Sequence, residues 1–183
     1  MHPPGPTAAE VTTFWRAAGP PNWFRRDAAF DREIEARFRA SHEAAVAGRR
    51  GDWEATPEGA LALLLLLDQF PRNMFRGSAR AFATDPLARR IAERAIARGF
   101  DARVASAERV FFHLPFEHSE DLADQERSLA LARQSGDSEV VKHAQMHADI
   151  IRRFGRFPHR NAILGRATTP EEQAFLDAGG FAG

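Results

Sequence analysis

The chain has 183 residues, with 25 basic and 25 acidic side chains and neither cysteine nor tyrosine. This length is typical of one domain and suffices to bury a core without disulfides or metals. The composition excludes a thiol nucleophile, a Cys-based metal site and a tyrosine acid, and the zero net charge argues against a general polyanion binder. Lys142 is the only lysine, so a Schiff-base mechanism would depend on that residue alone.

Three helices are predicted in the first 70 residues. Thr7 and Glu10 form a capping box at the start of the first helix. The second helix begins at Asp27. Its apolar stripe consists of Phe30, Ile34 and Phe38. Thr56 is the expected N-cap of the third helix, which has a proline at its first position and runs to about Phe70.

The remaining helices are marked by caps and by glycines that end them. They are predicted to run from Asp85 to Gly99, from Ser106 to Pro115, from Ser119 to Gly136, from Asp137 or Ser138 to Gly155, and from Thr169 onward. No segment alternates between apolar and polar residues with the period of two that is typical of β-strands. The predicted fold class is therefore all-α, with about seven to eight helices. Short connections after residue 84 favour an array of antiparallel αα-hairpins.

We expect a single helical domain over residues 7–178. The Pro/Gly-rich residues 1–6 and residues 179–183 are predicted to be disordered ends. Because the N-terminus resembles no signal peptide and the longest apolar run has only eight residues, from Ala60 to Leu67, the expected location is the cytoplasm.

Asp68 is the first departure from these local rules. It follows an apolar helix and places a carboxylate in the last turn, where the helix dipole disfavours an anion. A buried carboxylate needs a partner, and Arg72 and Asn73 follow after Pro71, which is expected to turn the chain. Two interpretations stay open: Asp68 and Arg72 pair to stabilise the turn, or Asp68, Arg72 and Asn73 line a pocket.

A second departure is an acidic stretch, in which five carboxylates fall between residues 117 and 126. Some of them are expected to complement a helix N-terminus. His118 lies just before that helix, and Gln125 falls on its apolar stripe. Two interpretations are consistent with this stretch. Either the acids simply cap the helix and cover a solvent-exposed face, or they form part of a polar site.

His147 is the third departure, because it falls on the apolar stripe of its helix and should point inward. A hydrogen-bonded core histidine is one interpretation. His143 lies one turn earlier, so the two imidazoles could bind a metal with His118 and Asp121, but the metalloprotease glutamate is missing between them. We therefore assign no metal site.

The fourth departure is a basic stretch between Asp149 and Glu171 that contains no acid. It includes Arg156, His159, Arg160 and Asn161. Arginine forks suit carboxylate or phosphate recognition, and the interleaved Phe154 and Phe157 raise base stacking on nucleic acid as an alternative. This stretch could equally neutralise the acidic stretch at 117–126 within the fold.

The chain resembles the bacterial family known as domain of unknown function 924. The matching motifs are Asn22–Phe24, Phe30–Asp31, Arg37–Phe38 with His42, Leu67–Gly77, Pro115–Phe116, His118–Glu126, His147–Ile151, Arg156–Asn161, Leu164–Arg166 and Thr169–Glu172. They extend over roughly residues 11–176. The resemblance implies a tetratricopeptide-like helical fold and no known activity.

Two functional hypotheses follow. In the first, a pocket binds a small anionic molecule, with turnover left open. Its catalytic candidates are His118, Asp121 and His147, and its ligand-binding candidates are Asp68, Arg72, Asn73, Glu120, Arg156, His159, Arg160 and Asn161. This hypothesis predicts that these segments converge around one cavity.

In the second hypothesis, the chain is a tetratricopeptide-like scaffold that binds a protein or peptide without catalysis. A G-x-S-x-G elbow, a P-loop and a G-x-G-x-x-G fingerprint are all missing from the sequence, so the cofactor is unknown. We expect neither a membrane nor a nucleic acid as partner, and the oligomeric state is not indicated.

Overall fold

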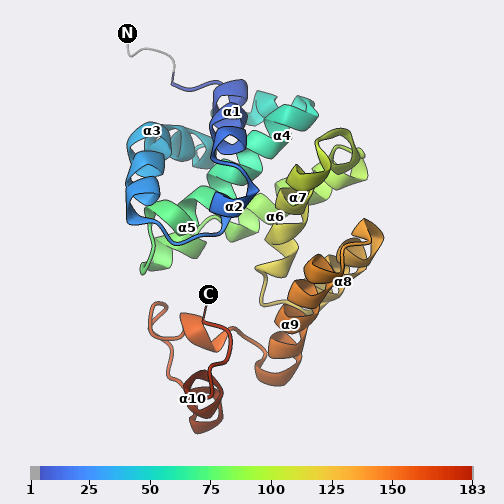
Figure 1. The fold of residues 1–183 in the computed structure, drawn as a ribbon. Coiled ribbons are helices and arrows are strands. Elements are labelled where there is room, and N and C mark those ends of the chain that lie inside the picture. The colour runs from blue at the N-terminus through green and yellow to red at the C-terminus, as the bar shows by residue number, and fades with distance from the viewer. Residues whose placement is uncertain (1–4, 183) are drawn as a thin grey trace. The chain divides into compact units, whose positions relative to one another are not determined.

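The computed structural model describes residues 5–182, and every regular element in that range is helical, which confirms the all-α prediction (Figure 1). Within the described residues, internal contacts group the chain into two compact units, residues 5–76 with 80–115 and residues 77–79 with 116–182. The domain boundaries at 7 and 178 and the tetratricopeptide-like arrangement stay predictions. Residues 1–4 and 183, expected to be disordered, lie outside the described residues.

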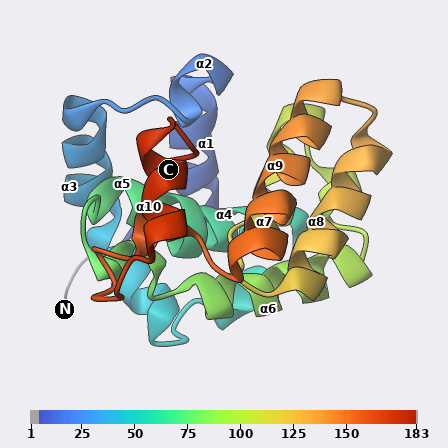
Figure 2. The same ribbon diagram turned by 90° about the horizontal axis from the view of Figure 1, so that it is seen from below.

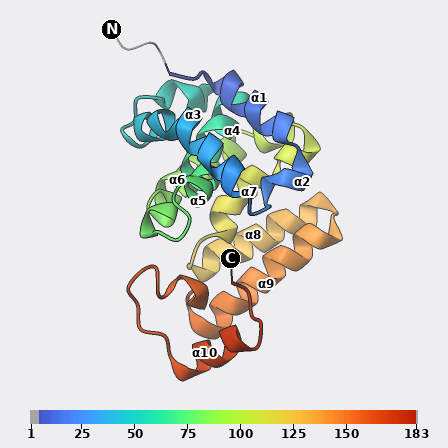
Figure 3. The same cartoon turned by 60° about the vertical axis from the view of Figure 1, so that its left-hand side comes forward.

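The first unit is built around a buried central helix. Its helices are α1 (Ala8–Ala18), α2 (Pro20–Trp23), α3 (Ala28–Val46), α4 (Pro57–Leu64), α5 (Phe70–Met74), α6 (Asp85–Ala97) and most of α7 (Val110–Glu117). Helices α1 and α6 both pack against α4, and α3 packs against α5 (Figure 3). Every residue of α4 from Gly59 onward is buried, as expected for a helix that is apolar on all sides.

The predicted helix starts at Thr7, Asp27 and Thr56 are confirmed in this unit. The Thr7 hydroxyl accepts a hydrogen bond from the Glu10 amide at 3.3 Å, and the Glu10 carboxylate accepts one from the Thr7 amide at 2.8 Å. Asp27 caps α3 through the Ala29 and Phe30 amides. The sequence did not predict α2, a single turn whose Trp23 indole donates to the main-chain oxygen of Trp15 at 2.8 Å.

The expected turn at Pro71 is wrong. The helix continues from α4 into α5 through a π-helical turn, Leu65–Gln69, in which the Phe70 amide bonds to the Leu65 oxygen, five residues back. Pro71 has no amide proton, so it cannot complete an α-helical bond to the oxygen of Leu67. The π turn spans the position where that bond is missing, and the chain stays helical from Pro57 to Met74.

Side chains from elsewhere in the unit bond to the main-chain oxygens of this turn. His42 Nδ1 lies 2.8 Å from the Leu66 oxygen, and the Thr84 hydroxyl donates to the Leu67 oxygen at 2.6 Å. Arg72 donates to the Asp68 oxygen at 2.8 Å. A carbonyl oxygen only accepts, so His42 must carry its proton on Nδ1. The turn is thus held by His42 and Thr84, which are distant in sequence, and by Arg72, one helical turn away.

Three further helix boundaries differ from their predictions. The helix predicted from Ser106 is a 3-10 turn at Ser106–Glu108, and α7 begins only at Val110. Pro115 lies inside α7, which continues to Glu117, rather than ending the helix. The buried amide of Gln125 donates to the main-chain oxygens of Glu117 and Ser119, both at 2.6 Å, and this capping stabilises the end of α7. Asp121, not Ser119, is the N-cap of the following helix, through the Ala123 amide at 2.8 Å.

The second unit contains a helical hairpin and a short last helix. Helices α8 (Leu122–Ser135) and α9 (Ser138–Phe154) pack side by side, joined at Gly136, whose φ of 73° ends α8 as predicted (Figure 2). Helix α10 (Pro170–Asp177) begins with a capping box at Thr169. Throughout residues 5–182, every helix is too short or too polar to cross a membrane.

Candidate functional site

The first unit contains the Asp68 group. Arg72 forms a two-pronged contact with Asp85, at 2.8 and 2.9 Å, and its NH1 lies 3.3 Å from the carboxylate of Asp68. Asp68 and Asp85 are both buried. Burial would lower the pKa of Arg72, but the two carboxylates outweigh it, and the pKa lies above its ordinary value. The predicted pairing of Asp68 with Arg72 is confirmed, with Asp85 as an additional partner, and the pocket interpretation stays a prediction.

Asn73 belongs to a neighbouring polar network. Its amide nitrogen donates to Asp31 at 2.8 Å and its oxygen accepts from Gln69 at 3.1 Å. Arg76 grips the same Asp31 carboxylate at 2.8 and 3.2 Å. This network ties α5 to α3, so its polar groups already have partners within the fold.

In the second unit, the basic stretch meets the acidic stretch at Glu120. Arg166 donates to both oxygens of Glu120, at 2.6 and 3.0 Å, and the Phe157 amide donates to Oε1 at 2.8 Å. Burial raises the pKa of Glu120, whereas Arg166 and the Phe157 amide lower it and prevail. Neutralisation of the acidic stretch by the basic one, weighed as an alternative above, is confirmed at this carboxylate.

Arg156 and Asn161 both contact the buried carboxylate of Glu172. Arg156 Nε donates to Glu172 at 2.6 Å and its NH2 donates at 2.8 Å, while Asn161 donates at 3.1 Å and the Thr169 amide at 2.8 Å. Arg156, followed by the Thr169 amide, lowers the pKa of Glu172 to about 2, even though burial opposes the change. Glu172 is therefore a fixed anion that joins α10 to the basic stretch.

Arg160 is buried, with only 6% of its surface exposed. Its NH1 donates to the main-chain oxygen of His118 at 3.0 Å, and its guanidinium lies 4.5 Å from the centre of the Phe157 ring. The side chain of Asp121, by contrast, is exposed and caps α8. Arg160 thus connects the segment of His118 with the segment of Phe157.

His147 points inward, as predicted, and is 5% exposed. Its Nδ1 lies 2.9 Å from the main-chain oxygen of His143 and 3.3 Å from Glu117 Oε1. Both neighbours are acceptors, so Nδ1 carries the proton. Burial, and then the charges of His118, His143 and Arg160, lower the pKa of His147 to about 3. The ring is neutral near pH 7, and its Nε2 is an acceptor.

This shift predicts a specific loss of stability in acid. The folded pKa of His147 lies below the unfolded value of about 6.5, so the unfolded chain binds more protons between pH 6.5 and pH 3. The stabilisation is complete above pH 6.5 and is lost as the pH falls. When the pH falls from 6.5 to 4, the free energy of unfolding should fall for both proteins. We expect the fall to be about 3 kcal/mol smaller for His147→Gln than for the wild type, and urea denaturation measures it.

The exposed His143, one turn earlier on α9, provides the control for this measurement. His143→Gln should retain most of the wild-type pH dependence, because burial, the largest cause of the lowered pKa of His147, is unchanged in that variant. Burial also lowers the pKa of His42 and His113, but both are present in every variant and cancel in the comparison. Equal slopes for wild type and His147→Gln would contradict the assignment of a buried neutral imidazole.

Aromatic rings surround His147. The Phe181 ring lies 4.6 Å from the His147 ring and 5.1 Å from the His159 ring, edge to face in both cases. Phe157 lies 5.5 Å from His147 and 5.7 Å from His159. Phe181 falls in the segment expected to be a disordered end, yet it packs against this cluster. Long-range packing, which no local pattern in the tail reveals, accounts for the difference.

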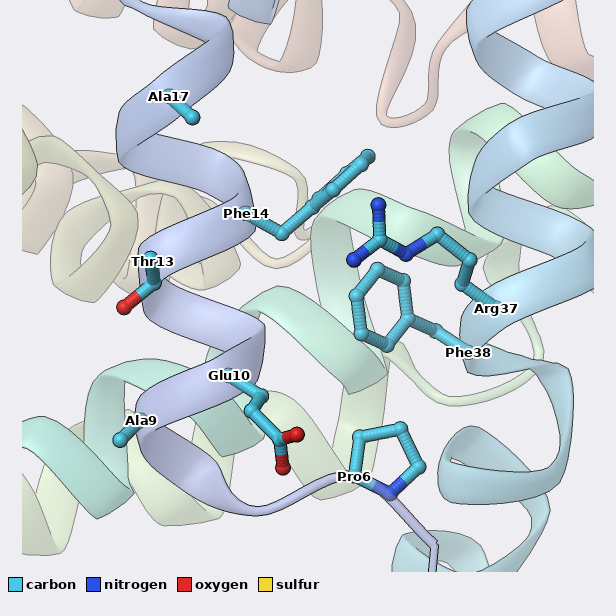
Figure 4. A pocket seen from close by; sticks show the side chains of 8 residues that line it. All are labelled: Pro6, Ala9, Glu10, Thr13, Phe14, Ala17, Arg37 and Phe38. Atoms are coloured by element: carbon cyan, nitrogen blue, oxygen red, sulfur yellow. The ribbon is translucent and has the colours of Figure 1, made fainter.

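An open pocket of about 410 Å³ lies elsewhere, between α1 and α3 of the first unit. Figure 4 shows Phe14 and Arg37 pointing toward one another across it, above the ring of Phe38. The guanidinium of Arg37 lies 4.7 Å from the centre of the Phe14 ring. The residues lining this pocket include none of the predicted site residues.

The predicted site residues thus fall into two groups. His118, Glu120, His147, Arg160 and the residues around them meet in the second unit. Asp68, Arg72 and Asn73 meet in the first, so the convergence of all segments on one cavity stays a prediction. Residues 5–182 contain no group of three or more His, Asp or Glu side chains arranged to hold a metal.

Sequence reasoning missed three contributors to these groups. Asp85 was treated only as a helix start, and Glu172 only as part of a helix-start motif. Phe181 was assigned to a disordered end. Their partners lie 13 and 16 residues away for the two acids, and farther for Phe181. The only available signal was that each acid could match an arginine of opposite charge.

Comparison with known proteins gives two matches. Residues 11–180 match the family model described as bacterial protein of unknown function, DUF924. A solved structure of a protein of unknown function, ATU0120 from Agrobacterium tumefaciens, is 53% identical with a TM-score of 0.91. The match covers 93% of this chain and 97% of that one. Among curated proteins, nothing matches.

Proposed function

This chain belongs to the DUF924 family of bacterial proteins of unknown function, and from that premise we propose that its second unit binds a small anionic molecule beside His147 and Arg160. The proposed site comprises His118, Glu120, His147, His159 and Arg160, with Arg156 and Asn161 as its supports. Asp68, Arg72 and Asn73 serve a structural role in this proposal, because Asp85 occupies the fork of Arg72.

The observation that carries the proposal is the electrostatic environment of His147. His118, His143 and Arg160 disfavour a proton on its ring, although Glu117 Oε1 lies 3.3 Å from Nδ1. Arg160 is the permanently charged member of this set, and its buried guanidinium favours an anion nearby, where water screens charge weakly. A guanidinium that is itself buried and held by the His118 oxygen supplies an oriented donor.

His147 fits a binding role better than a proton-transfer role. A general acid or base works best with a pKa near the working pH, and the pKa of His147 lies at about 3. Its Nε2 can accept a hydrogen bond from a hydroxyl or amide of the ligand. Asp121 caps α8 and serves in this proposal to fix the His118 segment rather than to transfer protons.

A thermal-shift screen of small anions tests the proposal, with inorganic phosphate, sulfate and mono- and dicarboxylates as probes. A ligand at 100 times its Kd should stabilise the protein by about 2.7 kcal/mol. Arg160→Lys keeps the charge but removes the planar fork, and we expect it to abolish the stabilisation. Arg152→Ala removes a more exposed arginine of the same unit, paired with Asp149, and should leave it intact. Stabilisation that survives Arg160→Lys would refute the proposal.

A peptide-binding scaffold is the second candidate function, favoured by the open pocket between α1 and α3. Arg37 reaches this pocket beside the rings of Phe14 and Phe38, and it pairs with Glu33 in a half-exposed contact that a competing carboxylate can replace. The fitting occupant is a peptide with an aromatic and an acidic side chain. A peptide of that kind whose binding is lost in Arg37→Ala but kept in Arg160→Lys supports this candidate.

A further inference from the structure

Four rings form a closed cluster in the second unit. Each of the imidazoles His147 and His159 contacts both phenylalanines, Phe157 and Phe181, at centroid distances from 4.6 to 5.7 Å. Phe157 is fully buried and belongs to the basic stretch. Phe181 is only half buried and belongs to residues 180–182, which have no regular structure. Phe157 is therefore fixed in the core, whereas Phe181 belongs to an irregular segment at the periphery of the unit.

Two glycines bring Phe181 to this position. Gly179 has a φ of +80°, in the left-handed region that favours glycine. A side chain on Gly180 would collide with Phe175, because a Cβ there would lie 2.5 Å from the ring and 2.6 Å from the main-chain oxygen. The chain therefore folds back closely over α10 after its last turn. This path is specific to the sequence and differs from that of a frayed end.

From these contacts we infer that Phe181 is a displaceable plug, and that the slot between His147 and His159 accepts the ring of an aromatic carboxylate. The inference rests on the proposed function, which provides the buried guanidinium of Arg160 for the carboxylate. The edge-to-face contacts of the two imidazoles with Phe181 can be remade with any planar ring. A ligand ring that replaces Phe181 therefore recovers the contacts that it breaks, while its carboxylate gains the interaction with Arg160.

Calorimetric titration of the full chain with benzoate tests the inference, with phosphate as an anion without a ring and benzyl alcohol as a ring without a charge. Removal of the plug in Phe181→Ala should raise the affinity for benzoate by about tenfold, since an occupied site lowers apparent affinity by the fraction of open molecules. The affinity for phosphate should stay unchanged. Phe30→Ala is the matched control, because it removes a half-buried phenylalanine of the first unit, packed on Phe14 and Trp15, that contacts neither imidazole.

Three results would overturn the inference: no gain for benzoate in Phe181→Ala, an equal gain in Phe30→Ala, or an equal gain for benzyl alcohol. If phosphate binds but Phe181→Ala brings no gain in affinity for benzoate, the role of Phe181 as a plug is refuted and the proposed function is not. Benzoate binding that Arg160→Lys leaves intact would instead remove the proposed function.

A second measurement does not depend on the folding of any variant. In the wild type, saturating benzoate should shift the NMR signals of the His147 and His159 ring protons and of Phe181 together, as the plug leaves the slot. Unchanged Phe181 signals at saturation would overturn the inference.

Discussion

Arg72→Ala is expected to lower the free energy of unfolding by about 3–5 kcal/mol, because it leaves two buried carboxylates without their shared cation. Asp68 and Asp85 are both buried, and the guanidinium bonds to the Asp68 main-chain oxygen as well. Removal of Arg72 therefore also withdraws a donor from the π turn. Urea denaturation followed by circular dichroism measures the loss.

The matched control is Arg94→Ala. Arg94 grips Glu54 with the same two-pronged geometry, at 2.8 Å for both bonds, but its side chain is 51% exposed and that of Glu54 is 29% exposed. Water can solvate Glu54 when the arginine is removed, so we expect a loss of about 0–1 kcal/mol. Similar losses for the two variants would contradict the view that burial, rather than geometry, makes Arg72 important.

Glu172→Ala is expected to cost about 3 kcal/mol. It removes the common acceptor of Arg156, Asn161 and the Thr169 amide, and it leaves the fully buried Asn161 amide without that acceptor. Chemical denaturation measures the global loss, and hydrogen exchange of the α10 amides should report early opening of that helix.

Glu171→Ala is the control for this variant, because it removes a carboxylate from the same first turn of α10. Both changes weaken the interaction with the helix dipole equally, so that effect cancels. Glu171 pairs with Arg153 at 3.0 Å, but these side chains are 64% and 52% exposed, and we expect a loss below about 1 kcal/mol. A loss from Glu171→Ala as large as that from Glu172→Ala would show that helix-start electrostatics alone explain the effect.

Much of the fold could be predicted from residues close together in the sequence. Helix starts at Thr7, Asp27 and Thr169 were correct, since a capping residue and the amide that it bonds to are only two or three positions apart. The inward direction of His147 also followed from helical spacing. These features depend on bonds within a single helical turn, so the sequence states them directly.

The candidate site was harder, because its contacts link residues distant in the chain. Glu120 and Arg166 are 46 positions apart, and many arginines of this sequence could have paired with that carboxylate equally well. The numbers of acidic and basic residues were therefore equally consistent with a ligand pocket and with neutralisation of the acidic stretch by the basic stretch within the fold. The geometry separates them at Glu120 and Glu172, where the forks of Arg166 and Arg156 are occupied by carboxylates of the same unit.

The sequence by itself determined that the chain is helical, where most helices begin and that His147 faces inward, because each depends on local hydrogen bonds and on side-chain periodicity. Only the tertiary structure decided that the helix passes through Pro71, that Asp85 occupies the fork of Arg72 and that Phe181 covers His147. Each of these requires a partner brought close by packing of the whole unit. Hydrogen bonds within one helical turn form whenever the backbone is helical. Contacts between residues distant in the sequence form only when the whole core has packed and excluded water.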